Sequence, residues 1–143
     1  MNKEKIAFIP RQYLAVIAVL LAIMMSVLDG TIMNIALPTL AHDFDVTPST
    51  AIWIVNAYQL VITMTLLSFA SLGDIYGYRR IFLIGISIFV GASLACTLST
   101  SFWMLTAARV IQGFGAACVM SVNTALIRLI YPPQILGRGM GVN

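Results

Sequence analysis

The sequence predicts an all-α integral membrane protein, with four transmembrane helices and the start of a fifth. Hydrophobic residues make up 60% of the 143 positions and charged residues only 9%, and the apolar residues gather in four long runs. A soluble domain carries about a quarter of its residues charged and could not bury this much apolar surface in one core. The chain is therefore expected to lie in a lipid bilayer.

The first apolar run extends over residues 13–37 and follows a short polar start. At 1.5 Å per residue, about 25 helical residues reach about 37 Å, which is enough to cross a bilayer with some tilt. A secretory signal peptide is the competing interpretation, but its apolar segment is about half as long. Asp29 inside the run also argues against a signal peptide. We therefore predict a transmembrane helix over 13–37.

The second apolar run predicts a helix over 48–72. It begins with Thr47 and Pro48, which are typical of an N-cap and of a first helical position. The polar segment 73–80 follows and is predicted to be a loop.

The third apolar run predicts a helix over 81–98. Gly91 and Ala95 lie four residues apart on it, and small residues at this spacing let another membrane helix approach closely.

The fourth apolar run predicts a helix over 102–130, because the sequence Tyr-Pro-Pro at 131–133 cannot continue it. The residues at 139–143 resemble the start of a fifth helix. We therefore interpret residues 1–143 as a partial N-terminal transmembrane domain.

The basic residues predict the orientation of the chain. The loops after the first and third helices carry no lysine or arginine, whereas the N-terminus, the second loop and the end of the fourth helix carry seven of the eight: Lys3, Lys5, Arg11, Arg79, Arg80, Arg128 and Arg138. Cytoplasmic loops carry the excess of basic residues. We therefore expect a multi-pass protein of a bacterial-type inner (plasma) membrane with its N-terminus in the cytoplasm.

Other function classes lack their signatures in this sequence. No phosphate-binding glycine loop, nucleophile elbow or metal-ligand cluster is present, so we predict no enzyme, no metal and no cofactor. Cys96 and Cys118 are interpreted as small packing residues, and His42 as a solvated loop residue. The net charge of +3 comes without a basic patch interleaved with aromatics, so no nucleic acid partner is expected.

Three polar side chains are predicted to lie at one depth in the membrane. Counted from the nearest helix end, Asp29, Asn56 and Arg109 each lie eight or nine residues inward. This places them about 12–14 Å below the outer surface. An ionised group in a membrane helix costs roughly 2.5–3.5 kcal/mol and is rarely there without a partner or a task. We predict that Asp29 and Arg109 compensate each other and that Asn56 and Gln112 supply hydrogen bonds.

Two interpretations of this pair stay open from the residues alone. Asp29 can be a protonation and substrate site, because a bound cation changes how readily a buried carboxylate holds its proton. Alternatively, the pair is a structural lock between the first and fourth helices. We favour function for Asp29, since intramembrane ionisable groups tend to mark transport pathways. Arg109 fits both interpretations equally, and Asn56 and Gln112 are expected to be interhelical hydrogen bonders.

Two segments resemble the major facilitator superfamily, and more narrowly its drug:proton antiporters of the fourteen-helix type. Residues 28–38 match that group's first-helix motif as L-D-x-T-x-x-N-x-A-L-P, and residues 105–117 match the fourth-helix motif of proton-driven members as L-x-x-x-R-x-x-Q-G-x-G-A-A. The resemblance implies proton transfer at Arg109 and substrate or proton coupling at Asp29. The other motif residues are expected to be a supporting polar residue and helix-packing positions, namely Asn34, Gly113 and Gly115.

The segment between the second and third helices resembles the superfamily signature G-x-L-A-D-R-x-G-R-K in part. Asp74, Gly77 and Arg79 fit it, whereas Ile75 and Tyr78 replace basic positions. We predict a gating loop at these three residues. A plain cytoplasmic loop would explain the arginines but not the spacing of Asp74 and Gly77.

The resemblance implies a membrane transporter, and we expect proton-coupled export of small hydrophobic cationic drugs, which is multidrug efflux and a cause of drug resistance. The proton gradient would drive it, and the missing C-terminal helices of a full-length transporter would complete the pathway. One alternative is an anion or sugar porter that uses Arg109 as its ligand-binding charge. The other is a truncated product that inserts into the membrane and transports nothing.

Overall fold

The computed structural model describes residues 4–130, and their side chains from 17 to 122 except at 19. Within this part of the chain, four helices follow one another: α1 (Glu4–Asp43), α2 (Pro48–Tyr76), α3 (Tyr78–Thr97) and α4 (Phe102–Ile130). Each is long and apolar enough to cross a membrane. The predicted all-α membrane class is therefore confirmed. The segments 131–133 and 139–143, including the expected start of a fifth helix, lie outside the described residues.

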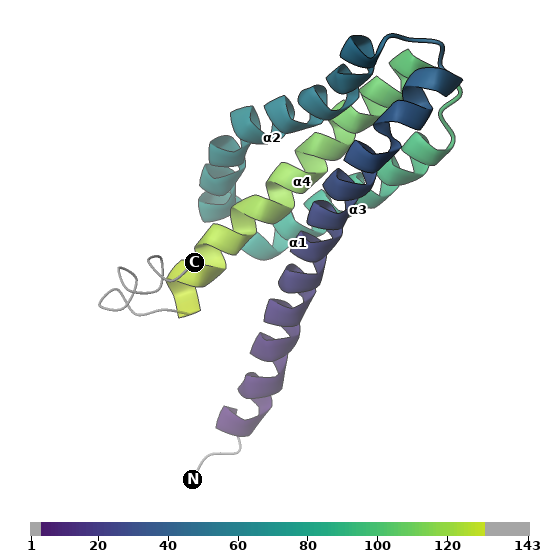
Figure 1. The fold of residues 1–143 in the computed structure, drawn as a ribbon. Helices are drawn as coiled ribbons and strands as arrows, with labels where there is room; N and C mark the ends of the chain where they lie inside the picture. The colour runs from purple at the N-terminus through teal and green to yellow at the C-terminus, as the bar shows by residue number, and fades with distance from the viewer. Residues whose placement is uncertain (1–3, 131–143) are drawn as a thin grey trace, which may run out of the picture.

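The fourth helix is the centre of the arrangement. α4 packs mainly against α2 and α3, and α1 makes fewer contacts with α2 and α4. Figure 1 shows the α1–α2 and α3–α4 connections at one end of the bundle, called the upper end below, and the α2–α3 junction toward the other. Most of α4 is buried among the other helices, whereas α1 is largely exposed. α4 therefore acts as the spine to which the other helices attach.

Three buried clusters follow one another along α4. The upper cluster contains residues of α2 and α4 and is covered by the end of α1, the middle cluster joins α2, α3 and α4, and the lower cluster joins α3 and α4. Their buried members are Ile54, Phe102 and Leu105 in the upper cluster, Tyr58, Phe89 and Ala116 in the middle one, and Ile81, Cys118 and Val122 in the lower one.

Glycines bring the helices close together at the middle of α4. A β-carbon on Gly115 would lie 2.6 Å from the Phe89 backbone nitrogen and 2.8 Å from the Gly85 carbonyl oxygen, so α3 and α4 touch backbone to backbone. A β-carbon on Gly113 would lie 3.0 Å from the Tyr58 carbonyl oxygen of α2. Gly91, the predicted close-approach position, is exposed, and within the described residues a β-carbon there would meet nothing within 4 Å, so its role stays a prediction. The contact of α3 with α4 is made at Gly85, which lies on the buried face.

The first helix extends beyond the predicted bounds 13–37 and continues as α1 through Pro38 to Asp43. A proline inside a helix removes one backbone hydrogen bond, whereas unwinding the chain would leave several groups unpaired in an apolar environment. The continuation also allows Leu40 and Phe44 to pack against the upper cluster. Residues 4–12 are helical as well.

The predicted loop 73–80 is almost entirely helical, so the prediction of a loop there is wrong. α2 continues to Tyr76 and α3 begins at Tyr78, so Gly77 alone separates the two helices. Gly73 lies inside α2, and the ring of Tyr78 packs against it: a β-carbon on Gly73 would lie 2.6 Å from that ring. Gly77 makes the turn with φ +90°, a conformation that residues with a side chain rarely adopt.

Replacing Gly77 by alanine is expected to destabilise the protein by about 1–3 kcal/mol, because the new β-carbon strains a backbone with positive φ. The change would be measured as the unfolding midpoint of the complete protein in detergent. Gly30→Ala is the matched control, since Gly30 is helical and its β-carbon would meet nothing within 4 Å. Equal stability of the two variants would contradict the role assigned to Gly77.

Candidate functional site

The site is built around an ion pair between α1 and α4. The Nη1 atom of Arg109 donates to Oδ2 of Asp29 over 2.6 Å, across 80 positions of sequence. The two residues lie inside apolar helices, where an unpaired charge is costly. The contact predicted from equal depth is therefore present, and it joins the largely exposed α1 to the buried spine.

Gln112 completes the network one turn along α4. Its Nε2 atom donates to Oδ1 of Asp29 over 3.1 Å, and its Oε1 atom accepts from Nη1 of Arg109 over 3.0 Å. The thiol of Cys96 on α3 also donates to Gln112 Oε1, over 3.6 Å. Both carboxylate oxygens of Asp29 are thus engaged, which offsets part of the cost of removing the pair from water.

The pair is unequally accessible. The Arg109 side chain is 4% exposed and the Asp29 side chain 20%. The carboxylate is therefore the more accessible partner of the pair. A buried cation beside a more accessible carboxylate is suited to exchange of a proton or a cation at the carboxylate.

A cavity of about 320 Å³ lies beside the pair, between α1, α2 and α4. Its walls are mostly apolar, with a few polar groups from α1 and α2. Ser26, Gly30, Thr31, Asn34, Tyr58, Gln59 and Arg109 are among the residues that line it. Mostly apolar walls with a few placed polar groups are typical of small-molecule sites, and the volume is at the lower end of their range of about 300–1,000 Å³.

Two residues predicted to support the pair do not join its network. Asn56 is exposed on α2 and, within the described residues, makes no hydrogen bond to the pair. The prediction that it bonds in this layer is wrong, because counting depth ignores direction: Asn56 and the buried Tyr58 lie about 200° apart around α2. Asn34 is also exposed and lines the cavity instead.

The predicted gating residues lie at the α2–α3 junction, apart from the ion pair. Asp74 and Arg79 are exposed there, and the Tyr78 hydroxyl donates a hydrogen bond to the Asp74 carboxylate. Gly77 is the turn residue. Their gating role stays a prediction.

Sequence reasoning missed Tyr58 and Gly85, and it interpreted Cys96 as a packing residue without predicting its bond to Gln112. Tyr58 carries the only signal that could have been used, since it shares one face of α2 with the buried Ala51 and Ile54 at helical spacing. Cys96 and Gly85 have no such distinguishing pattern. Their contacts depend on how α3 crosses α4.

The remaining candidate ligands do not form a centre. Within the described residues, no group of three or more His, Cys, Asp or Glu side chains comes together. His42 lies in the last turn of α1 rather than in a loop, and its side chain is 92% exposed beside Asp43.

Four apolar helices with an intramembrane ion pair beside a cavity define a membrane protein of the transporter class. The chain belongs to the major facilitator superfamily, whose pattern matches residues 19–143. This is a family of transporters and not of enzymes.

Three relatives show how this segment recurs in bacteria. The uncharacterized transporter YebQ of Escherichia coli (strain K12) is 58% identical over 135 residues, which are 94% of this chain and 30% of that protein. The riboflavin transporter RibZ of Clostridioides difficile (strain 630) is 35% identical over 92% of this chain and 29% of its own. The drug efflux pump JefA of Mycobacterium tuberculosis (strain ATCC 25618 / H37Rv) is 40% identical over 92% of this chain and 26% of its own.

The chain thus spans 30% or less of the length of these curated relatives. No solved structure shows a significant match to it.

Proposed function

We propose that this chain forms part of a proton-coupled exporter of small hydrophobic cations, of the fourteen-helix multidrug-efflux type. Asp29 alternates between holding a proton and contacting the cationic substrate. Arg109 stabilises the carboxylate in the interval when it holds neither. The proton gradient drives the cycle, and further helices of the complete transporter form the other wall of the pathway.

The unequal exposure of the ion pair is the observation that supports this proposal best. Asp29 is the more accessible partner and Arg109 the more buried one. A cation that reaches the exposed part of the carboxylate can compete with its proton, whereas an anion that binds Nη1 of Arg109 would have to displace Asp29 from a 2.6 Å contact. The mostly apolar cavity wall suits a hydrophobic substrate.

The names of two relatives bear on the substrate. One is a drug efflux pump and the other a riboflavin transporter, so similar segments occur in transporters of different substrates. The cation preference therefore rests on the residues of this chain.

Asp29→Asn is expected to abolish proton-driven export, because asparagine accepts a hydrogen bond from Arg109 but cannot exchange a proton. The complete natural reading frame would be expressed, and efflux of tetraphenylphosphonium measured in everted vesicles with an imposed pH gradient. Asp45→Asn makes the same change at an exposed position with φ 50°, which asparagine tolerates, and should export normally. Undiminished export by Asp29→Asn would refute the proposal.

An anion or sugar porter is the second candidate, and it draws on Arg109. This residue lines the cavity, and its buried Nε atom has no hydrogen-bond partner within the described residues. A ligand that accepts from Nε would use it. Inhibition of transport by organic anions, with no effect of tetraphenylphosphonium, would favour this function.

The proposed orientation places the N-terminus and the α2–α3 junction in the cytoplasm of a bacterial inner (plasma) membrane. Arg79 and Arg80 are exposed at that junction, and the connections at the upper end of the bundle carry no basic residue except His42 beside them. Basic residues are retained on the cytoplasmic side. Asp74, Gly77 and Arg79 would then gate the pathway from the cytoplasm.

A further inference from the structure

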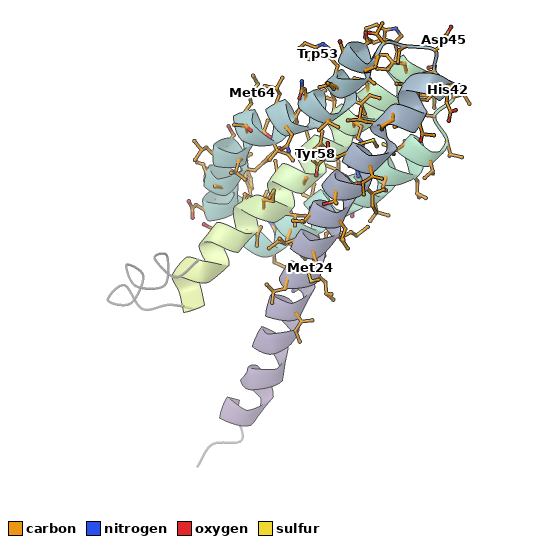
Figure 2. All side chains as sticks on the ribbon, viewed as in Figure 1. Met24, His42, Asp45, Trp53, Tyr58 and Met64 are labelled. Atoms are coloured by element: carbon orange, nitrogen blue, oxygen red, sulfur yellow. The ribbon has the colours of Figure 1, made fainter. Side chains whose placement is uncertain are left out.

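Tyr58 is a buried aromatic residue to which the proposed mechanism assigns no role. It belongs to α2, is 6% exposed, and lies with its ring 5.7 Å from the Cζ atom of Arg109. Figure 2 labels it within the region where the helices lie together. Building on the proposed function, we propose that Tyr58 is a positioning residue that couples occupation of the cavity to the Asp29–Arg109 ion pair.

The hydrogen bonds of Arg109 use one side of its guanidinium. Within the described residues, both of its bonds pass through Nη1, to Asp29 and to Gln112, while Nε has none. These two bonds engage Nη1 but not the Nε side of the guanidinium. The Tyr58 ring adds a contact from α2 to the same group, through the attraction of a cation to an aromatic face.

The Tyr58 ring is itself held by its surroundings. It packs with Phe89 of α3 and Ala116 of α4 in the middle cluster. Its backbone is fixed as well, because the Tyr58 carbonyl oxygen lies against Gly113, where a β-carbon would be only 3.0 Å away. A ring held this way is a firm support for the guanidinium.

A ligand in the cavity can reach the hydroxyl end of Tyr58. Tyr58 lines the cavity, and within the described residues its hydroxyl has no hydrogen-bond partner and is not fully enclosed. A substrate in the cavity can therefore contact the hydroxyl, or compete for the ring face if it is a cation. Either contact acts on the same ring that supports Arg109.

Few groups of the described residues can contribute to the proton equilibrium at Asp29. Among them, the charged or titratable side chains near it are Arg109 from α4, Tyr58 from α2 and, through Gln112, the Cys96 thiol from α3. Removal of the ring alone should therefore change how readily substrate displaces the proton.

Two substitutions separate the ring from the hydroxyl. Tyr58→Phe keeps the ring, so it should keep proton release on binding, with tetraphenylphosphonium affinity lowered by about 2- to 10-fold for the lost hydroxyl contact. Tyr58→Leu removes the ring, so the pH at which binding releases the proton should shift by about 0.5–1.5 units. Phe69→Leu is the matched control, because Phe69 is an aromatic residue of α2 whose ring packs edge-on against Phe114 instead.

The test uses calorimetric titration of the complete purified protein with tetraphenylphosphonium, across a pH series and in two buffers of different ionisation enthalpy. This measures protons released per cation bound. The inference holds if Tyr58→Leu shifts the pH profile while Tyr58→Phe and Phe69→Leu keep it. It is overturned if Tyr58→Leu keeps the wild-type profile.

A parallel titration of Asp29→Asn separates the two proposals. Proton release that persists in Asp29→Asn, or no binding of tetraphenylphosphonium by the wild type, refutes the proposed function. Loss of release in Asp29→Asn with an unchanged Tyr58→Leu profile refutes only the role of Tyr58.

If Tyr58→Leu does not fold, Tyr58→Met replaces it as the ringless variant. Failure of both to fold would overturn the inference, since Tyr58 would then be a core residue.

Discussion

Replacing Arg109 by methionine is expected to destabilise the protein by about 3–5 kcal/mol and to abolish proton-driven export. The physical reason is that methionine fills the space of Arg109 but leaves the Asp29 carboxylate without its 2.6 Å counter-ion. Breaking a buried pair by removing one partner leaves an uncompensated charge, which is what makes the loss large. Stability would be measured as the unfolding free energy of the complete protein in detergent.

A double variant shows whether the loss comes from the unpaired charge. In Arg109→Met combined with Asp29→Asn no charge is left, so most of the lost stability should return, although export should not. Arg80→Met is the control, because Arg80 is exposed at the start of α3 and makes no ion pair within the described residues. A double variant as unstable as Arg109→Met alone would show that Arg109 acts through packing.

Replacing Gly115 by alanine is expected to cost about 3 kcal/mol, at the upper end of the range for overpacking. A β-carbon there would lie 2.6 Å from the Phe89 nitrogen and 2.8 Å from the Gly85 carbonyl oxygen. These are backbone atoms, so no side-chain rotation can relieve the contact and α3 has to move away from α4. The effect would be measured as a lower unfolding midpoint in detergent.

Gly91→Ala is the matched control for this prediction. Gly91 is a helical glycine of α3 with no atom within 4 Å of its would-be β-carbon. Alanine there should leave stability unchanged or raise it by about 0.5–1 kcal/mol, because glycine is the poorer helix former. If both glycine variants lose the same stability, the close approach of α3 and α4 is not the cause.

These two predictions concern one helix. α4 carries Arg109 and Gln112 toward α1, while Gly113 and Gly115 bring α2 and α3 against it. A shift of α3 would also move Cys96 away from Gln112 Oε1. Gly115→Ala should therefore weaken coupling as well as stability.

The contact between Asp29 and Arg109 could be predicted because it depends on two quantities that the sequence contains. A charged residue in an apolar run indicates the need for a partner of opposite charge, and the number of residues from the helix end gives its depth in the membrane. The same count selected Asn56 on α2, which is exposed. Depth alone does not say which way a side chain points, and the direction depends on the rotation of the helix about its axis.

The sequence by itself determined the membrane class, the four apolar helices and the need of Asp29 for a cation, because hydropathy and charge are local properties that the bilayer acts on directly. Only the tertiary structure decided that Gln112 binds the second carboxylate oxygen, that Tyr58 lies against the guanidinium and that Gly85 rather than Gly91 meets α4. Those contacts depend on how each helix is rotated and where it crosses its neighbour. In a lipid bilayer, close packing and a few hydrogen bonds set the rotation and the crossing of each helix. Many different apolar sequences are compatible with the same rotation, so the sequence does not reveal it.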